Sequence, residues 1–250
     1  MIAGYTGKIG WINLSDGTIR VEDLEESVAR KYLGGKGLGA HLLYSHLKPG
    51  IEAYDPDNLL IFTTGPLTGT TFPAVARSAV ITKSPMTGTF MDSFSGAYFG
   101  PHLKYAGFDA LVIVGRAERP CYLLAEDGKV SVKDAGQLSG LTTLETEARL
   151  KDEYADQRPS VAAIGPAGEN RVRFAGIISD KRAYGRGGAG AVMGSKNLKA
   201  VVLIGKQKLK IADEDAFKEI NKRCRANIKK HPMVGKEGVF PNFGTMMTVA

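Results

Sequence analysis

The chain has 250 residues, of which 43% are apolar, and its formal net charge is +7. This length allows one large domain or one and a half ordinary ones. No run approaches the about 20 apolar residues that cross a bilayer, and the N-terminus lacks the pattern of a secretory signal. We therefore expect a cytoplasmic protein that does not enter a membrane.

The first half of the chain predicts several short strands and a few helices. A strand at 5–14 and one at 18–21 flank the hairpin signal Asp16-Gly17. Asp23 and Glu26 have the spacing of a capping box for a helix that ends at Gly34-Gly35, and a second helix is predicted at 38–47. Further elements are strands at 59–63, 75–82, 89–93 and 109–114, and a helix at 97–105.

The second half predicts a hairpin at 121–132 around Asp127-Gly128 and a helix from Thr142, capped by Glu145, to about Tyr154. Strands follow at 160–164, 171–178 and 200–204, with a glycine run and its helix before the last of them. Because strands do not alternate regularly with helices, we expect an α+β fold: a β-rich base of antiparallel or mixed sheets with a few short helices.

The base is predicted to span residues 1–211, and the start of a helical second domain is predicted at 212–250. Residues 213–230 form a basic helix pattern, 231–250 are loop-like, and 243–250 resemble the first turn of another helix. A helix start without a body suggests that the second domain is truncated. Since aromatic residues do not alternate with the basic ones as stacking on bases would need, a solvated helix is favoured over a face that binds nucleic acid or an acidic partner.

Three loops are candidates for holding an anion. Arg77 lies on an apolar strand and needs an anionic partner if it faces inward, whereas an exposed edge charge needs none. Ser95 and Gly96 precede a helix and form an anion-friendly turn or a simple cap. The run 181–196 places Arg182 and Arg186 among glycines ahead of a helix, which suits a phosphorylated cofactor.

Other constellations are weaker. Gly35-Lys-Gly-Leu-Gly-Ala40 follows a helix pattern rather than a strand, so it lacks the context of a dinucleotide site. Cys121 and Cys224 lie far apart without CxxC spacing, which argues against a disulfide framework and a self-contained metal site. Glu169 and Asn170 either orient a ligand or stabilise their own turn. No catalytic residue is identified.

Taken in order, these segments resemble the N-terminal domain of the tungsten-dependent aldehyde ferredoxin oxidoreductase family over about residues 4 to 205. The resemblance is carried by Tyr5-Thr-Gly-Lys-Ile, Tyr32-Leu-Gly-Gly-Lys-Gly-Leu-Gly, Gly65-Pro-Leu-Thr-Gly-Thr70, Thr82-Lys-Ser-Pro, Ser95-Gly-Ala-Tyr-Phe-Gly100, Leu103-Lys-Tyr-Ala-Gly-Phe-Asp109, Ile164-Gly-Pro-Ala-Gly-Glu-Asn170 and Gly185-Arg-Gly-Gly-Ala-Gly-Ala-Val-Met-Gly-Ser-Lys-Asn-Leu-Lys-Ala200.

The resemblance implies that the domain carries a tungsten (or molybdenum) bis-molybdopterin whose metal is held by pterin sulfurs. It implies that Arg77 binds a pterin phosphate and that backbone carbonyls of Phe94 and Ala183 reach a bridging magnesium ion. It also implies cofactor contacts by further residues, namely Ser95, Gly96, Arg182, Gly185 and Arg186. The family often has His where Lys181 stands and Asn where Phe94 stands, so only the main-chain role of Phe94 carries over.

The implied activity is oxidation of aldehydes to carboxylic acids, with electrons passing through a [4Fe-4S] cluster to ferredoxin. The cluster ligands and substrate pocket belong to later helical domains or a partner subunit, so this chain alone is expected to be incomplete and inactive. A homodimer fits the resemblance. Alternatives are a family member that catalyses a different reduction, and a stand-alone pterin- or nucleotide-binding module without turnover.

Overall fold

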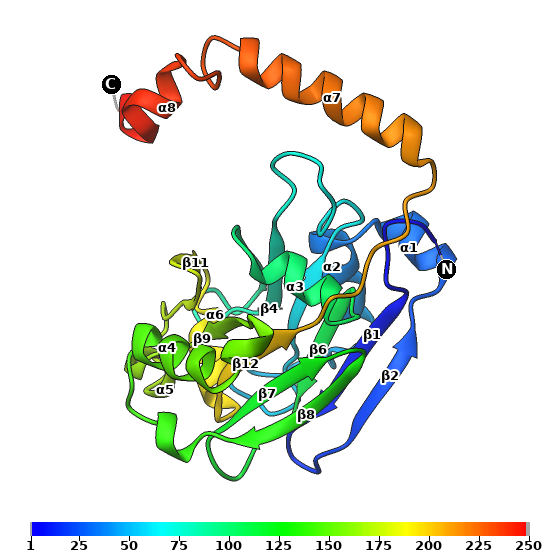
Figure 1. The fold of residues 1–250 in the computed structure, drawn as a ribbon. Helices are drawn as coiled ribbons and strands as arrows, with labels where there is room; N and C mark the ends of the chain where they lie inside the picture. Colours follow the sequence, from blue (N-terminus) through cyan, green and yellow to red (C-terminus); the bar gives the residue numbers. More distant parts are fainter. Residues whose placement is uncertain (1, 249–250) are drawn as a thin grey trace. The chain divides into compact units, whose positions relative to one another are not determined.

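The structure is a computed structural model that describes residues 2–248. Two compact units make up the chain: the first comprises the residues up to Thr70 and Ala76–Lys210, the second Thr71–Val75 and the residues from Ile211 onward. The first unit contains two six-stranded sheets and several short helices (Figure 1). The predicted α+β class is therefore confirmed.

The first sheet has the strand order β2-β1-β6-β3-β4-β5. All its neighbouring pairs are antiparallel except β1 and β6, which run parallel. The turn at Asp16-Gly17 joins β1 to β2 as predicted, with Gly17 at φ +72°. The bounds of the strands are β1 Lys8–Asn13, β2 Ile19–Asp23, β3 Leu60–Thr64, β4 Ser78–Lys83, β5 Phe90–Ser95 and β6 Ala110–Val114.

The second sheet has the order β11-β10-β9-β12-β7-β8, with β12 and β7 parallel. The predicted strand at 171–178 is shorter in the structure because Arg171 lies at φ 55° in a hydrogen-bonded turn, donating its N–H to Gly168 O at 2.9 Å. The bounds are β7 Cys121–Glu126, β8 Lys129–Asp134, β9 Ser160–Ala163, β10 Ile177–Ser179, β11 Arg182–Tyr184 and β12 Leu198–Ile204.

Helix ends follow local chemistry in one case and tertiary packing in another. Thr142 and Glu145 form the predicted capping box at the start of α4. The box predicted at Asp23 and Glu26 is wrong, because Asp23 is the last residue of β2 and α1 has no side-chain cap. The helices of this unit are α1 Glu26–Tyr32, α2 Gly35–His46, α3 Phe99–Tyr105, α4 Thr143–Glu153, α5 Pro166–Glu169 and α6 Ala189–Ser195, with 3-10 turns η1 Gly136–Leu138 and η2 Ala155–Gln157.

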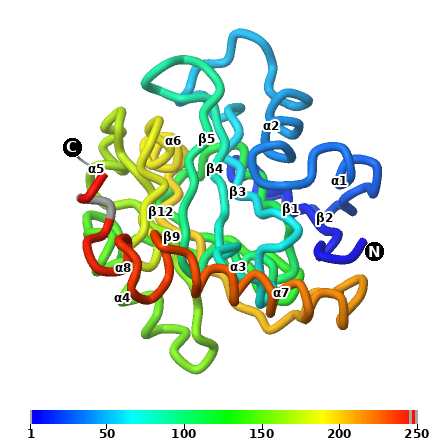
Figure 2. Tube along the Cα trace, turned by 90° about the horizontal axis from the view of Figure 1, so that it is seen from above, coloured from blue at the N-terminus to red at the C-terminus, as the bar shows by residue number. Residues whose placement is uncertain are grey.

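Three apolar clusters divide the first unit into layers. One lies between the first sheet and α1 and α2, one lies between the two sheets and includes α3 and α6, and one lies between the second sheet and α4. β4 and β5 run between α2 and α6 in the view of Figure 2. β2 meets β8 at one side of the sandwich and β5 meets β11 at the other, so edge strands of the two sheets cover each other.

The main element of the second unit is α7 Glu214–Lys230. Asp213 is its N-cap residue, and the Asp213 carboxylate accepts from the N–H groups of Asp215 and Ala216. The loop predicted over 231–250 is wrong where α8 Val239–Phe243 forms. The 3-10 turn η3 Gly244–Thr248 follows it, within the helix start predicted at 243–250. The helix start predicted at 243–250 extends beyond residue 248 and so lies partly outside the described residues.

Candidate functional site: an arginine-bearing edge between two sheets

The three segments predicted to hold an anion lie at the ends of β4 and β5 and along β11. These strands meet because β5 pairs with β4 and contacts β11. Ser78 pairs with Ser95 at one end of the β4–β5 ladder, so Arg77 and Gly96 leave the first sheet at the same end. The backbone N–H of Arg186 donates to Ser93 Oγ on β5 at 3.2 Å. We call the surface formed by Arg77, Arg182 and Arg186 and these strand ends the arginine edge.

Tyr184 joins the two sheets beneath the arginine edge. Its ring is fully buried between Phe62 and Phe99, at centroid distances of 6.0 and 6.2 Å, and its hydroxyl shares a hydrogen bond with Ser78 Oγ. Burial raises the pKa of this hydroxyl far above its ordinary value. The phenol therefore stays neutral and holds β11 against the start of β4.

A two-residue turn fixes the hairpin that carries Arg182 and Ala183. Asp180 and Lys181 lie at φ 48° and 61°, as the type I′ turn between two antiparallel strands requires. The Asp180 carboxylate accepts from Lys151 Nζ at 2.8 Å and from Ser160 Oγ at 3.1 Å. This left-handed backbone at two non-glycine residues is thus held by contacts outside the hairpin.

The charged groups of the arginine edge face solvent. Within residues 2–248, the guanidinium groups of Arg77, Arg182 and Arg186 form no ion pair or hydrogen bond, and all three residues are exposed. A Cβ added at Gly96 would have a single neighbour 4.0 Å away, and one at Gly185 a single neighbour at 3.5 Å. Unpaired guanidinium groups beside uncovered backbone are a donor set that fits a phosphorylated ligand.

The other predicted contact residues differ in what they expose. The side chain of Phe94 is 42% exposed on β5 and Ala183 is exposed on β11, whereas Ser95 is only 2% exposed. Arg77 precedes β4 and is exposed, which matches the alternative of an edge charge. Neither Ser95 nor Gly96 caps α3, because Tyr98 occupies the N-cap position without a side-chain bond.

The glycine run itself has mainly a packing role. A Cβ at Gly194 would lie 1.9 Å from Gly168 O, and one at Gly188 would lie 2.0 Å from Arg173 O. The N–H of Gly190 in the first turn of α6 donates to Ala175 O at 2.8 Å, and α6 is buried along its length. The expectation that this helix start attracts an anion is therefore wrong, because protein atoms already occupy it.

Lys196 and Lys199 are buried and bind loops whose role the sequence did not decide. Lys199 Nζ forms an ion pair with Glu169, whose carboxylate also accepts from Gly140 N, so Glu169 stabilises the fold rather than a ligand. Lys196 is fully buried, and its Nζ donates to Pro56 O at 3.0 Å and to Gly115 O at 3.3 Å. Burial lowers the pKa of Lys196 to about 7.

Sequence reasoning missed the residues that assemble the arginine edge, chiefly Ser78, Ser93 and Tyr184. The detectable signal was small polar residues within otherwise apolar strands, and one aromatic residue inside the glycine run. Within residues 2–248, no three His, Cys, Asp or Glu side chains lie together as a metal site would need. Burial raises the pKa of the Cys121 thiol to about 11.

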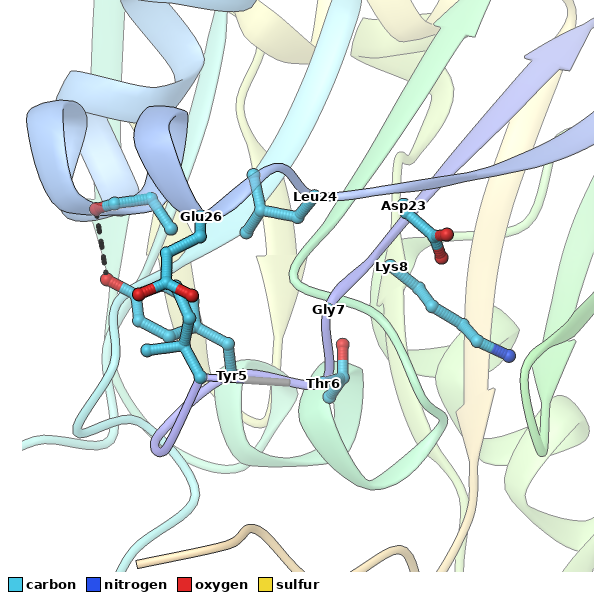
Figure 3. Close-up of a pocket in the computed structure, with 9 residues that line it drawn as sticks. Tyr5, Thr6, Gly7, Lys8, Asp23, Leu24 and Glu26 are labelled. Carbon is cyan, nitrogen blue, oxygen red and sulfur yellow. Dashed lines mark hydrogen bonds between the residues drawn. The ribbon is translucent and has the colours of Figure 1, made fainter. Parts of the chain in front are cut away.

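A separate pocket of about 320 Å³ lies beside the N-terminal loop (Figure 3). Tyr5 lines the pocket, and its hydroxyl donates to Ala29 O at 3.4 Å. The charged residues that line the pocket are Lys8, Asp23 and Glu26. With two carboxylates to one ammonium, this pocket lacks the positive charge of the arginine edge. It is the poorer candidate for a phosphate group.

A sequence profile described as "Aldehyde ferredoxin oxidoreductase, N-terminal domain" matches residues 9–205. The chain is 47% identical over 247 residues to a "Tungsten-containing aldehyde ferredoxin oxidoreductase" of Pyrococcus abyssi, covering 98% of this chain and 40% of the relative. It is 43% identical over 247 residues to the protein of that name from Pyrococcus furiosus, with the same coverage.

Among solved structures, the "Active site complex BamBC of Benzoyl Coenzyme A reductase in complex with 1,5 Dienoyl-CoA" superposes with a TM-score of 0.90 at 37% identity, covering 93% of this chain and 36% of that one. The chain thus spans about 40% of the length of the curated relatives it matches. No helix in the described part of the chain is both long and apolar enough to cross a membrane. From the profile match and these identities, the chain belongs to the aldehyde ferredoxin oxidoreductase family and contains its N-terminal domain.

Proposed function

We propose that this chain is the cofactor-holding part of a tungsten-dependent oxidoreductase, and that the arginine edge binds the phosphate groups of a bis-molybdopterin cofactor. The observation that carries the proposal is the set of exposed guanidinium groups at Arg77, Arg182 and Arg186, which have no partner among the described residues and lie on the same edge as the uncovered glycines Gly96 and Gly185. Relatives named as tungsten-containing enzymes support the choice of metal.

Arg77 and Arg186 would approach a phosphate from different sheets, and Arg182 would add a third donor from the β10–β11 hairpin. Backbone carbonyls of Phe94 and Ala183 lie on the edge strands β5 and β11, and carbonyl oxygens suit Mg²⁺ bridging the phosphates. The cofactor, when bound, would supply the two-electron redox chemistry. The chain's own residues would hold and orient it.

The complete protein would oxidise aldehydes to carboxylic acids and pass electrons through a [4Fe-4S] cluster to ferredoxin. The names of the relatives at 47% and 43% identity support this activity. Helical domains or a partner subunit would supply the cluster ligands, the substrate pocket and the catalytic residues. Molybdenum in place of tungsten, a homodimer and a cytoplasmic location remain predictions.

A reductive member of the family is the second candidate. It is favoured by the TM-score of 0.90 with a benzoyl coenzyme A reductase complex. Assays of the anaerobically purified protein with a viologen dye distinguish the two candidate functions. An aldehyde-oxidising enzyme reduces the oxidised dye when an aldehyde is added. The second candidate consumes reduced dye with an aromatic acyl-CoA.

The arginine edge is tested by Arg77→Ala and Arg186→Ala, each of which removes a charge-assisted contact of about 1.5–3 kcal/mol. We expect bound tungsten, measured by elemental analysis, to fall in both variants. Arg119→Ala is the matched control, because Arg119 is also exposed and has no polar partner within residues 2–248. Full tungsten occupancy in both test variants would refute the proposal.

A further inference from the structure

The loop that leads into Arg77 leaves the first compact unit for five residues and then returns to it; we call these five residues the excursion. Thr71–Val75 belongs to the second unit, while Thr70 and Ala76 on either side belong to the first. Arg77 lies two residues after Val75, the last residue of this excursion. The residues that hold the excursion can therefore influence an arginine of the proposed phosphate site through the chain itself.

Helix α7 binds this excursion through a closed network of hydrogen bonds. Asn221 Nδ2 donates to Thr71 O at 3.1 Å and to Thr71 Oγ1 at 3.2 Å, and Arg225 Nη2 donates to Thr71 O at 2.7 Å. Arg225 Nε also donates to Asn221 Oδ1 at 2.8 Å, which closes the triangle. Asn221 is 9% exposed and is the one buried residue of α7.

An aromatic pair supports the same contact. The rings of Phe72 and Phe217 lie with centroids 6.2 Å apart. Phe217, Asn221 and Arg225 follow at intervals of four residues, so they share one face of α7. That face therefore contacts the five-residue excursion at both Thr71 and Phe72.

The two ends of the loop are fixed separately within the first unit. Tyr105 OH donates to Gly69 O at 3.1 Å, and Thr68 Oγ1 donates to Arg77 O at 3.0 Å. Between these ends, Ala74 lies at φ 63°, a left-handed conformation that is unfavourable for a non-glycine residue. Such a conformation persists only where surrounding contacts enforce it. The network on Thr71 is a contact of this kind, three residues from Ala74.

We propose that Asn221 and Arg225 are positioning residues for Arg77: by holding Thr71 they keep the 70–77 loop in the conformation from which Arg77 reaches the phosphate. The inference rests on the proposed function of the arginine edge. Fixing the loop before the ligand arrives removes the entropy cost of ordering it during binding. α7 would then act on the cofactor without touching it.

The test uses Asn221→Ala and Arg225→Ala in the purified protein, with Asn227→Ala and Arg223→Ala as matched controls. The controls remove the same side-chain types from α7 at exposed positions that form no hydrogen bond to residues 71–75. Hydrogen exchange of peptides covering 70–77 and elemental analysis of tungsten are measured on each variant.

We expect exchange of the 70–77 amides to accelerate at least tenfold and tungsten content to fall in both test variants, while the controls match the parent protein. Arg225→Lys keeps the charge but replaces the two guanidinium nitrogens that donate to Asn221 and Thr71 with a single ammonium nitrogen, so it should give an intermediate loss. Because a merely structural role would speed exchange without releasing metal, faster exchange with full tungsten overturns the inference, as does unchanged exchange.

Arg77→Ala measured in parallel separates the two claims. Loss of tungsten in Arg77→Ala together with its retention in the Asn221 and Arg225 variants overturns the positioning inference alone. Retention of tungsten in Arg77→Ala refutes the phosphate role of Arg77 and the inference with it. If Asn221→Ala does not fold, Thr71→Val removes only one acceptor at an exposed residue and should give the same changes at smaller amplitude.

Discussion

Replacing Lys196 by Met should change the stability of the protein in a strongly pH-dependent way. The ammonium is fully buried, and its hydrogen-bond partners are the carbonyls of Pro56 and Gly115 rather than a carboxylate. Burial is the main cause that lowers its pKa from 10.5 to about 7, and the nearby Arg116 adds to the shift. Lys196 is therefore charged at pH 6 and neutral at pH 10 in the folded protein.

The sign of the effect follows from proton linkage. Between pH 7 and about pH 10.5 the unfolded chain binds a proton at Lys196 that the folded chain does not, so stability rises with pH across this window. Below pH 7 the full penalty of the buried charge is present, on the order of 5 kcal/mol for a shift of this size. Above pH 10.5 the penalty is absent.

Lys196→Met removes the charge and two hydrogen bonds. Within residues 2–248, Gly115 O is left without a donor, which costs about 1–3 kcal/mol, whereas Pro56 O keeps the hydrogen bond from Gly115 N at 2.8 Å and loses only about 0.5–1.5 kcal/mol. At pH 6 the relieved penalty and the lost hydrogen bonds oppose each other, and the net change is small or stabilising. At pH 10 only the loss of these hydrogen bonds remains, so the variant is destabilised by about 1.5–4.5 kcal/mol relative to the parent protein.

Urea unfolding of both proteins at pH 6, 8 and 10 measures this difference, with Lys208→Met as an exposed control. The free-energy difference between variant and parent should become more destabilising by several kcal/mol from pH 6 to pH 10, and the control should show no such trend. A difference for Lys196→Met that is the same at all three pH values would show that the amine keeps its charge, and would refute the reasoning.

Two further substitutions test the packing of the first unit. Asp109→Asn leaves the buried ammonium of Lys104 without its counter-charge and should lower the free energy of unfolding by about 3–5 kcal/mol; an unfolding midpoint within error of the parent would contradict it. Gly194→Ala places a Cβ 1.9 Å from Gly168 O and should lower the melting temperature markedly. Gly65→Ala, where nothing lies within 4 Å of the added Cβ, is its control, and equal melting temperatures for the two variants would show that α6 can shift at no cost.

The local elements of the fold follow from short stretches of sequence. The capping box at Thr142 and Glu145, the turns at Asp16-Gly17 and Asp127-Gly128, and the apolar strands are encoded by neighbouring residues, whose side chains satisfy the backbone within one turn. Prediction failed where a distant contact decides the structure. Asp23 becomes part of β2 because β1 pairs with it, although its spacing from Glu26 suits a helix cap.

The motifs were sufficient to identify the family, because loops that hold a ligand constrain residue types at fixed spacings. They did not reveal which glycines face a ligand and which pack against backbone. Gly185 is open and Gly194 lies against Gly168 O, yet both stand in the same run. Only the fold distinguishes them, since the neighbour that a Cβ would meet comes from a separate segment.

Sequence by itself determined the α+β class, most strand positions and the family, all of which depend on local pattern. Tertiary structure decided the parallel pairings β1–β6 and β7–β12, the burial of Lys196, and the meeting of β5 with β11. These features join residues about a hundred positions apart. Their free energy arises only when both partners leave water together, so no window of the sequence contains it.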